Sequence, residues 1–520
     1  MTTALPKWFT PLRLLGIFCL TNLVVYLDRG LIASNGVNGT PRTEADPDGS
    51  GIQGEFDLTY FEDGLLPALF MVGLLISSPI FAETVKHYSA FRLLGIGMAV
   101  WSAAVVACGI APTFGLLLTA RAFVGVGEAS FVALAAPFID DFAPAAQKAR
   151  WFAAFYLCIP VGFALGYIVG GAVTAVASWR WAFVGEGLAM VPFILFALMA
   201  QPLQLRGSKP AGAAHHRHHH RTASGWQHWR ALLKEFGGDV AIVFRQRVWL
   251  SVCGAYTAYV AVLGVYAYWG PQAGAALFFP RHEGDTGPRS STADLTFGGV
   301  TVLTGVVGSI AGGLALDKMG STLRNANLLC ALSNLVGFVF LLLAFTTSRS
   351  FAAFMGLFAV GQLIIFLLQA PVAAIGMWCV PPELRPLGAS LMTVSIHLLG
   401  DVPSPPLVGL LQQRLAAGKS PEDAAQQWRI SLSVVSLLLL VSGGLFLLGA
   451  WLSVPGTDWR GKAPANEEQG SDAGDGVGGE EGLVGAGVGE GGPDVRPLLL
   501  EEGGAGRQRS SDEPLIGSEK

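Results

Sequence analysis

Two adjacent opposite charges, Asp28 and Arg29, lie inside a segment that is otherwise apolar enough to cross a membrane. The segment runs over residues 11–34, and a membrane-spanning helix needs about 20 apolar residues. A charged side chain at the bilayer centre costs at least ~2.5 kcal/mol. A chain keeps such a pair at that depth only where the charges face other helices or a water-filled cavity. This favours a pathway through the membrane over a simple anchor.

The composition is that of an integral membrane protein. Of its 520 residues, 52% are hydrophobic and only 13% are charged, whereas soluble domains have about 25% charged residues. The six cysteines lie in or at the ends of apolar segments and include no CxxC pair, so we expect neither disulfides nor a metal site. No cofactor is expected. The spans contain no HExxH, nucleophile elbow or P-loop, which argues against an enzyme or an ATP-driven pump.

Twelve apolar segments of spanning length predict an all-α membrane protein. Their approximate limits are 11–34, 58–82, 91–112, 114–138, 150–176, 181–203, 248–271, 296–316, 325–346, 350–379, 386–412 and 430–453. Two similar halves are typical of transporters built from repeats. We expect an N-terminal six-helix bundle over 1–204, a solvated basic, histidine-rich linker over 205–247, a C-terminal six-helix bundle over 248–456 and a disordered acidic, glycine-rich tail over 457–520.

The charges of the loops predict that both termini are cytoplasmic. The short loops on that side and the linker are basic, and the first loop on the other side is acidic, as the positive-inside rule requires. That acidic loop also contains the glycosylation sequon Asn38-Gly39-Thr40. In the tail, residues 494–499 match an acidic dileucine spacing that can bind sorting adaptors, although accidental leucines would look the same.

A second spanning segment, over 114–138, carries its own opposite charges. Arg121 and Glu128 are seven residues apart and lie on one helix face with Gly125 between them. Together with Asp28 and Arg29 they form two acids and two bases of zero net charge. Such a cluster is tolerable in a desolvated cavity, and protonation of one acid would release an arginine to bind an anion. The alternative is a static network that holds the helices together.

Three further charged pairs are candidates for gating or coupling. Asp317 and Lys318 belong to a G-x-x-x-D-K-x-G stretch at the cytoplasmic end of the eighth segment. The matching place in the first half has an acid and a base, Glu83 and Lys86, but lacks the glycines. His397 and Asp401 are four residues apart in the eleventh segment and can hydrogen-bond, either as a coupling pair or as a structural one.

The spans also contain polar side chains that are candidates for lining a cavity. These are Tyr26, Tyr256, Tyr259, Gln362 and Gln369. Tyr268 and Trp269 lie at the end of a span, where aromatic residues usually form the membrane-interface belt.

Glycines at four-residue intervals mark faces for close helix packing. They are Gly162, Gly166 and Gly170 in the fifth segment and Gly308 and Gly312 in the eighth.

Several blocks resemble a known family. The stretch at 313–320 and the arginine-containing fourth segment resemble motifs of the major facilitator superfamily. Tyr26 to Arg29, Arg121 to Phe131 with the following 136–141, Tyr268 to Pro271 and Ser395 to Gly409 resemble its spinster family, especially plant and algal members. The resemblance covers nearly the whole bundle but neither the linker nor the tail. It implies the twelve-helix major facilitator fold, with the fifth and eighth helices facing each other so that both glycine stripes would lie on the moving interface.

The resemblance also implies a function, the export of sphingolipids or lysophospholipids by alternating access, with proton coupling in some members. By motif match, Asp28, Arg29, Arg121 and Glu128 would bind substrate and protons, and helices one, four, seven and ten would line the cavity. The implied partners are a lipid substrate, protons and the surrounding membrane lipids, with no nucleic acid. The implied location is a late endosomal, lysosomal or vacuolar membrane. Two alternatives are a carrier of a water-soluble organic anion and a non-transporting receptor or scaffold.

Overall fold

The computed structural model describes residues 8–42, 47–85, 88–144, 147–200, 203, 225–279 and 291–460. All of them belong to one compact unit, Met1–Pro464. The histidine-rich run at 215–221 and the tail with its dileucine motif lie outside the described residues.

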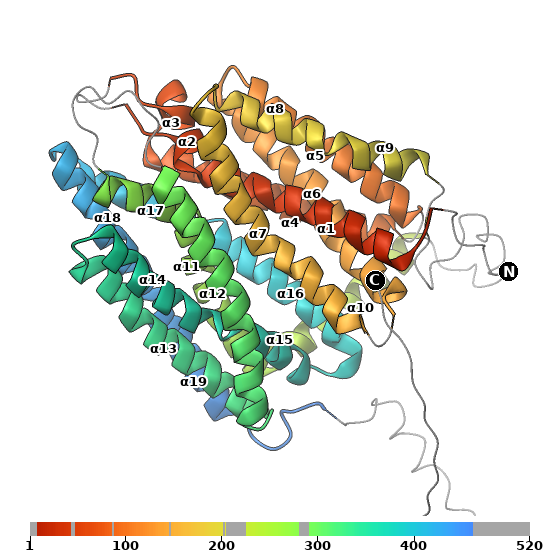
Figure 1. Ribbon diagram of the computed structural model, residues 1–520. Helices are drawn as coiled ribbons and strands as arrows, with labels where there is room; N and C mark the ends of the chain where they lie inside the picture. Colours follow the sequence, from red (N-terminus) through yellow and green to blue (C-terminus); the bar gives the residue numbers. More distant parts are fainter. Residues whose placement is uncertain are drawn as a thin grey trace, which may run out of the picture. The chain divides into compact units, whose positions relative to one another are not determined.

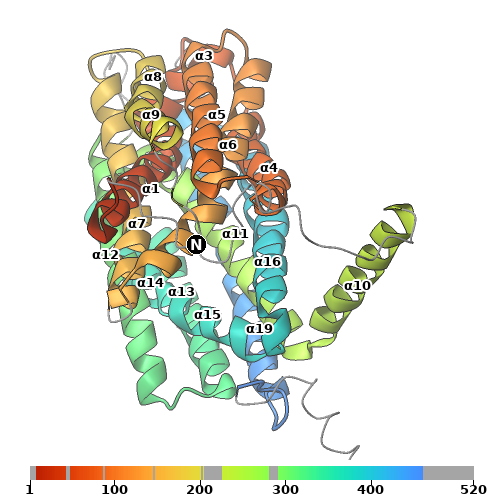
Figure 2. The same cartoon turned by 90° about the vertical axis from the view of Figure 1, so that its right-hand side faces the viewer.

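The described residues form a helical bundle with twelve helices long and apolar enough to cross a membrane, which confirms the all-α, twelve-span prediction. The first half contains α1 (Pro11–Ala33), α4 (Tyr60–Thr84), α5 (Ala90–Ile110), α6 (Phe114–Phe142), α7 (Lys148–Thr174), and α8 (Arg180–Ala189) with α9 (Val191–Met199). The second half contains α11 (Arg247–Phe278), α12 (Ser291–Lys318), α13 (Leu323–Thr347), α14 (Phe351–Phe366) with α15 (Gln369–Trp378), α16 (Arg385–Ile396) with α17 (Ser404–Ala416), and α18 (Pro421–Ser436) with α19 (Leu438–Leu452). Figures 1 and 2 show these helices from two directions.

Three short or separate helices complete the fold. The loop after α1 forms α2 (Asn35–Asn38) and α3 (Gly51–Phe56). Part of the expected linker is helical instead of irregular, because α10 (Gly225–Arg245) precedes α11. Its C-terminal turn is anchored, since Val243 is buried and the ring of Phe244 lies 5.4 Å from that of Trp249. The rest of α10 extends away from the bundle (Figure 2).

The eleventh span is interrupted where the sequence suggests a continuous helix. Between α16 and α17, His397–Asp401 forms a π-helical turn, a geometry often found at functional sites. Pro403, Pro405 and Pro406 follow directly. Proline lacks the backbone N–H that would continue the helical ladder. The prolines are compatible with the interruption, which leaves Asp401 at a π-helical turn in the middle of a span.

The glycine stripe of α7 packs against α1 within the first half. A Cβ on Gly30 would lie 2.0 Å from the carbonyl oxygen of Phe163, and one on Gly166 would lie 2.2 Å from that of Leu27. On α12, Gly308 and Gly312 face Phe366 and Leu367, within the second half. The expectation that both stripes lie on the interface between the halves is therefore wrong. Helices α7 and α12 do pack together, and Gly298 of α12 approaches Ala164 of α7.

The bundle has two ends, named here after residues at each. The Lys318 end contains the end of α12 and the start of α11, and the Asn35 end contains α2, the start of α12 and the end of α11. The loop charges predict that the Lys318 end is cytoplasmic. Between the halves, α1 contacts α11, α4 contacts α17 and α7 contacts α12.

Candidate functional site: a charged cavity between the two halves

The four charged residues predicted to cluster form two ion pairs between α1 and α6. Arg121 donates to Asp28 through two parallel bonds, Nη1 to Oδ1 at 2.8 Å and Nη2 to Oδ2 at 2.9 Å. Arg29 donates to Oε1 of Glu128 through Nη2. Asp28 and Glu128 are fully buried and Arg121 is 1% exposed, whereas the Arg29 side chain is 14% exposed. Arg29 is therefore the most accessible charge of the four.

Aromatic rings hold the two arginines in place. The guanidinium carbon of Arg29 lies 4.6 Å from the ring centre of Tyr26 and 4.8 Å from that of Phe70, and that of Arg121 lies 5.6 Å from Phe70. A cation over an aromatic face is attracted by the ring quadrupole, more strongly where water is excluded. Helix α4 comes close enough to supply Phe70 because Gly125 of α6 carries no side chain where the Phe70 carbonyl lies.

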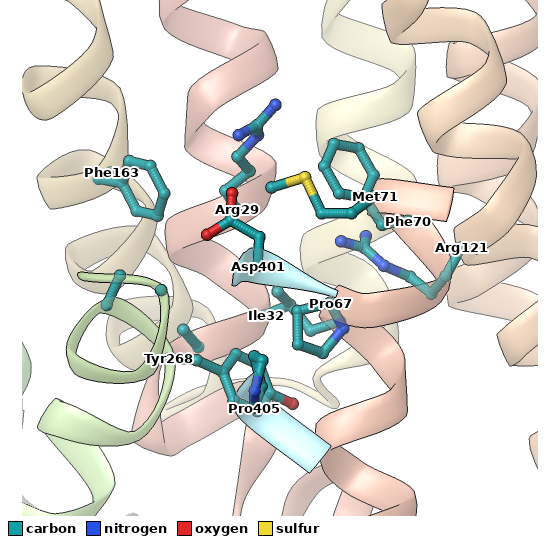
Figure 3. Close-up of a pocket in the computed structure, with 13 residues that line it drawn as sticks. Arg29, Ile32, Pro67, Phe70, Met71, Arg121, Phe163, Tyr268, Asp401 and Pro405 are labelled. Atoms are coloured by element: carbon teal, nitrogen blue, oxygen red, sulfur yellow. The ribbon is translucent and has the colours of Figure 1, made fainter. Parts of the chain in front are cut away.

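A partly open cavity lies between the halves beside these pairs, with about 490 Å³ of empty space that includes some open solvent. Its polar lining consists of Arg29, Arg121, Tyr268 and Asp401. The other walls are apolar: Ile32, Ala33, Pro67, Phe70, Met71, Phe163, Gly264, Ala267 and Pro405. In Figure 3, the guanidinium of Arg29 points away from the carboxylate of Asp401, and the guanidinium of Arg121 lies between Phe70 and Pro67. The cavity is therefore amphipathic, with cations on one side and mostly hydrocarbon around them.

The lining residues come from more helices than expected. The first, fourth and seventh spans contribute through Arg29, Arg121 and Tyr268, as predicted. The tenth span contributes none of the residues that line this cavity. The second, fifth and eleventh spans contribute instead, through residues such as Phe70, Phe163 and Asp401. Asp401, the contribution of the eleventh span, lies at the end of its π-helical turn.

The second half adds its own titratable pair. Nδ1 of His397 lies 2.8 Å from Oδ2 of Asp401, as the four-residue spacing predicted, although the intervening turn is π-helical rather than α-helical. The side chains of His397 and Asp401 are 19% and 12% exposed. Asp401 also interacts electrostatically with Arg29. The pair thus links the second half to the charges of the first, while its gating role stays a prediction.

The Asn35 end is closed by hydrogen bonds between the halves. Asp294 of α12 accepts from the backbone N–H of Asn35 at 3.1 Å and from its Nδ2 at 2.7 Å. Nδ2 of Asn35 also donates to the carbonyl of Pro271 at 3.0 Å, and Nε2 of Gln272 donates to that of Gly39 at 3.4 Å.

A second set of bonds joins α4 to α11 at this end. The hydroxyl of Tyr268 donates to Oδ1 of Asp63 at 2.8 Å, and Oδ2 of Asp63 accepts from Asn38 and Gln53, each at 3.0 Å. Tyr268 is 4% exposed and Trp269 is fully buried, so their expected place in the membrane-interface belt is wrong. They are interior residues because the halves meet here. The sequon asparagine, Asn38, is 1% exposed and donates a hydrogen bond to Asp63, so the folded structure leaves no room for a glycan on it.

Three buried acids of the described bundle are not among the site candidates predicted from the sequence. Asp63, Asp294 and Glu186 are 0%, 1% and 6% exposed. Asp63 and Glu186 stand inside segments expected to span the membrane, so the rule that singled out Asp28 would have found them. Asp294 stands just before its expected segment and gave no such signal.

The five residues expected to line a cavity lie elsewhere in the bundle than the cavity walls. Tyr256 donates to Oε1 of Gln369 at 3.1 Å, and Nε2 of Gln369 donates to Tyr259 at 3.3 Å. Gln362 accepts from Thr304 at 3.3 Å. Tyr26 stacks beside Arg29, behind the cavity surface. A contact of these residues with substrate stays a prediction.

Few contacts are described for the residues predicted to form a gate at the Lys318 end. Asp317 and Lys318 are exposed, and Asp317 accepts a hydrogen bond from Ser321 in the following turn at 3.1 Å. Lys86 lies outside the described residues, and of Glu83 only its place in α4 is described. Among the residues that are described, no three His, Cys, Asp or Glu side chains gather as metal ligands.

Comparison with known proteins identifies the family. Residues 18–405 match the Major Facilitator Superfamily. The chain is 43% identical over 453 residues to the "Probable sphingolipid transporter spinster homolog 2" of Arabidopsis thaliana, covering 86% of this chain and 88% of that protein. It is 32% identical to "Protein spinster homolog 1" of Homo sapiens, covering 84% and 79%.

The fold agrees with a solved structure. A bacterial homolog of the human lysosomal transporter Spinster, in an inward-facing and occupied conformation, matches with a TM-score of 0.68 at 15% identity, covering 87% of this chain and 100% of that one. The chain therefore belongs to the spinster family of the major facilitator superfamily, and it is a membrane transporter rather than an enzyme.

Proposed function

We propose that this transporter carries a single-chain lipid with an anionic head group, a sphingolipid or a lysophospholipid, by alternating access coupled to protons. The observation that carries the proposal is the cavity lining: two arginines among hydrocarbon walls. A guanidinium suits bidentate recognition of a phosphate, and the apolar walls suit an acyl or sphingoid chain. The printed name of the plant relative, which refers to sphingolipids, supports the same substrate class.

The ion pairs suggest how protons would be coupled to the substrate. In the structure both arginines are neutralised, Arg121 by Asp28 and Arg29 by Glu128. Protonation of Asp28 or Glu128 would free its arginine for the head group, and substrate release would let the pair re-form. Because Arg29 is the more accessible of the two arginines, we assign the first contact with the head group to Arg29 and the matching protonation to Glu128.

The state of the bundle supports alternating access. Among the described residues, the hydrogen bonds that join the halves involve Asn35, Asp63, Tyr167, Tyr268 and Gln272, all toward the Asn35 end. A transporter with that end closed would open at the Lys318 end, which the loop charges place in the cytoplasm. We further propose that both termini are cytoplasmic, that the tail carries sorting information, and that the protein works in a late endosomal, lysosomal or vacuolar membrane.

Transport by purified protein tests the substrate class. Full-length protein is reconstituted into liposomes, and uptake of radiolabelled sphingosine phosphate, lysophosphatidic acid and the organic anion lactate is measured with and without a pH gradient. The proposal expects uptake of at least one lipid, stimulated by the gradient, and none of lactate. Uptake of lactate alone would establish the organic-anion carrier instead. If the protein takes up neither class, and deleting residues 457–520 abolishes its effect in cells, a receptor or scaffold is favoured.

A further inference from the structure

Glu186 is a buried acid that forms no ion pair or hydrogen bond with the part of the chain that the structure describes. It lies on α8, is 6% exposed, and neither Oε1 nor Oε2 has a hydrogen-bond partner. Helix α8 is pressed against α5 at this level: Ser102 donates to the carbonyl of Gly187 at 2.7 Å, and a Cβ on Gly187 would lie 2.6 Å from Val106. A carboxylate without donors in such a place would lose its hydration with no compensation.

The surroundings of Glu186 belong to the charged cluster of the cavity. Its carboxyl group is close enough to Asp28 of α1 and to Arg121 and Glu128 of α6 for electrostatic interaction, and Cys108 of α5 is within the same range of Asp28, Arg121 and Glu186. Arg121 uses both terminal nitrogens on Asp28, while its Nε is buried without an acceptor. One unpaired donor of Arg121 and two unpaired acceptors of Glu186 thus share one buried region.

We propose that Glu186 is a proton-binding site of the transport cycle, and that it competes with Asp28 for Arg121. In the state described here Arg121 pairs with Asp28 and Glu186 keeps its proton. When Arg121 turns toward Glu186, the O–H bond of Glu186 breaks and the proton passes to the carboxylate of Asp28, which has lost its arginine. The three groups have zero net charge before and after this step, which is the condition for charges to remain inside a low-dielectric bundle.

The exchange links a hidden acid to the cavity. Glu186 is absent from the cavity lining, whereas Arg121 is part of it. A head group that draws Arg121 into the cavity would therefore change the proton affinity of both Asp28 and Glu186. This inference rests on the proposed proton-coupled transport, but the protonation of Glu186 can be measured without any substrate.

Infrared spectroscopy of the purified full-length protein is the first test. The wild type should show a carbonyl-stretch band of a protonated carboxylic acid near neutral pH. Glu186→Gln should lose this band, Glu186→Asp should restore one, and Glu422→Gln should keep it, because Glu422 is an exposed acid on α18 far from the cluster in the chain. A band that persists unchanged in Glu186→Gln overturns the proposal.

The pH dependence of lipid uptake is the second test. One obligatory proton changes a rate by up to about tenfold per pH unit. Glutamine imitates the protonated acid permanently, so Glu186→Gln should flatten the pH profile, and Glu186→Asp should keep it sloped. A lost infrared band with an unchanged profile would make Glu186 a neutral structural acid and overturn its part in the cycle. Failure of the wild type to transport lipid would instead refute the proposed function, while the infrared result still decides the protonation.

Discussion

Removing the hydroxyl of Tyr268 should open the Asn35 end. This hydroxyl donates to Oδ1 of Asp63 at 2.8 Å and lies 3.1 Å from the Asp63 carbonyl, across the interface between α4 and α11. A hydrogen bond to a charged group contributes about 1.5–3 kcal/mol. In Tyr268→Phe, Asp63 keeps its bonds from Asn38 and Gln53, so we take the lower value.

The size of the shift between the closed and open states follows because this hydrogen bond forms only when the Asn35 end is closed. In the state with the Asn35 end open, Tyr268 and Asp63 both meet water, so the substitution costs the closed state alone. A loss of about 1.4 kcal/mol shifts an equilibrium tenfold, and an open fraction of about 1% would rise to about 10%. Tyr266→Phe is the matched control: its hydroxyl bonds Ser436 at 2.6 Å within the second half, and this bond does not depend on the closure.

Electron spin resonance distances can measure this shift. In a background without the six native cysteines, Pro112→Cys with Arg349→Cys reports the Asn35 end, and Arg92→Cys with Arg324→Cys reports the Lys318 end; all four positions are exposed. Tyr268→Phe should populate longer distances for the first pair and shorter ones for the second. Tyr266→Phe should lower thermal stability and leave both distributions as in the wild type. If Tyr268→Phe also leaves both unchanged, the bond to Asp63 does not hold this end closed.

Three further predictions concern the packing and the ion pairs. Gly30→Ala should destabilise the protein by about 1–3 kcal/mol in a thermal unfolding assay, because its Cβ would overlap the Phe163 carbonyl. Gly16→Ala on the same helix has no atom within 4 Å of the new Cβ, and equal stability of the two variants would refute the close α1–α7 contact. Arg121→Lys should reduce lipid uptake at least about tenfold, since lysine cannot make the two parallel bonds to Asp28. Arg13→Lys, at an exposed position, should leave uptake unchanged. Unchanged uptake in Arg121→Lys would show that the two parallel bonds are not needed for transport. Glu128→Gln should abolish pH-dependent uptake without loss of folding while keeping the infrared band assigned to Glu186, and uptake that is still pH-driven would remove Glu128 from the mechanism.

Much of the architecture could be predicted because the bilayer imposes simple rules on a sequence. Length and hydropathy locate the twelve spans, and charges inside apolar segments single out Asp28, Arg29, Arg121 and Glu128. Which helix meets which glycine stripe could not be predicted, since Gly166 offers a close approach to any neighbour and only the three-dimensional packing selects α1.

The same limit explains the misplaced aromatic residues. From its position near a span end, Tyr268 resembles an interfacial tyrosine, and its partner Asp63 is 205 positions away in the sequence. Asp401 likewise lies at a π-helical turn, which residue spacing alone does not reveal. Contacts between helices far apart in the sequence, both within and between the halves, are therefore what residue patterns do not predict.

Binding of an anionic lipid head group by Arg29 is the central claim, and its most direct test is uptake of radiolabelled sphingosine phosphate into liposomes containing wild-type protein, Arg29→Gln or Arg13→Gln. Arg29 lines the cavity, whereas Arg13 is an exposed residue in the first turn of α1. The account predicts uptake by the wild type and by Arg13→Gln, and at least about a tenfold loss in Arg29→Gln, corresponding to one charge-assisted hydrogen bond. Uptake by Arg29→Gln at the wild-type rate would contradict it.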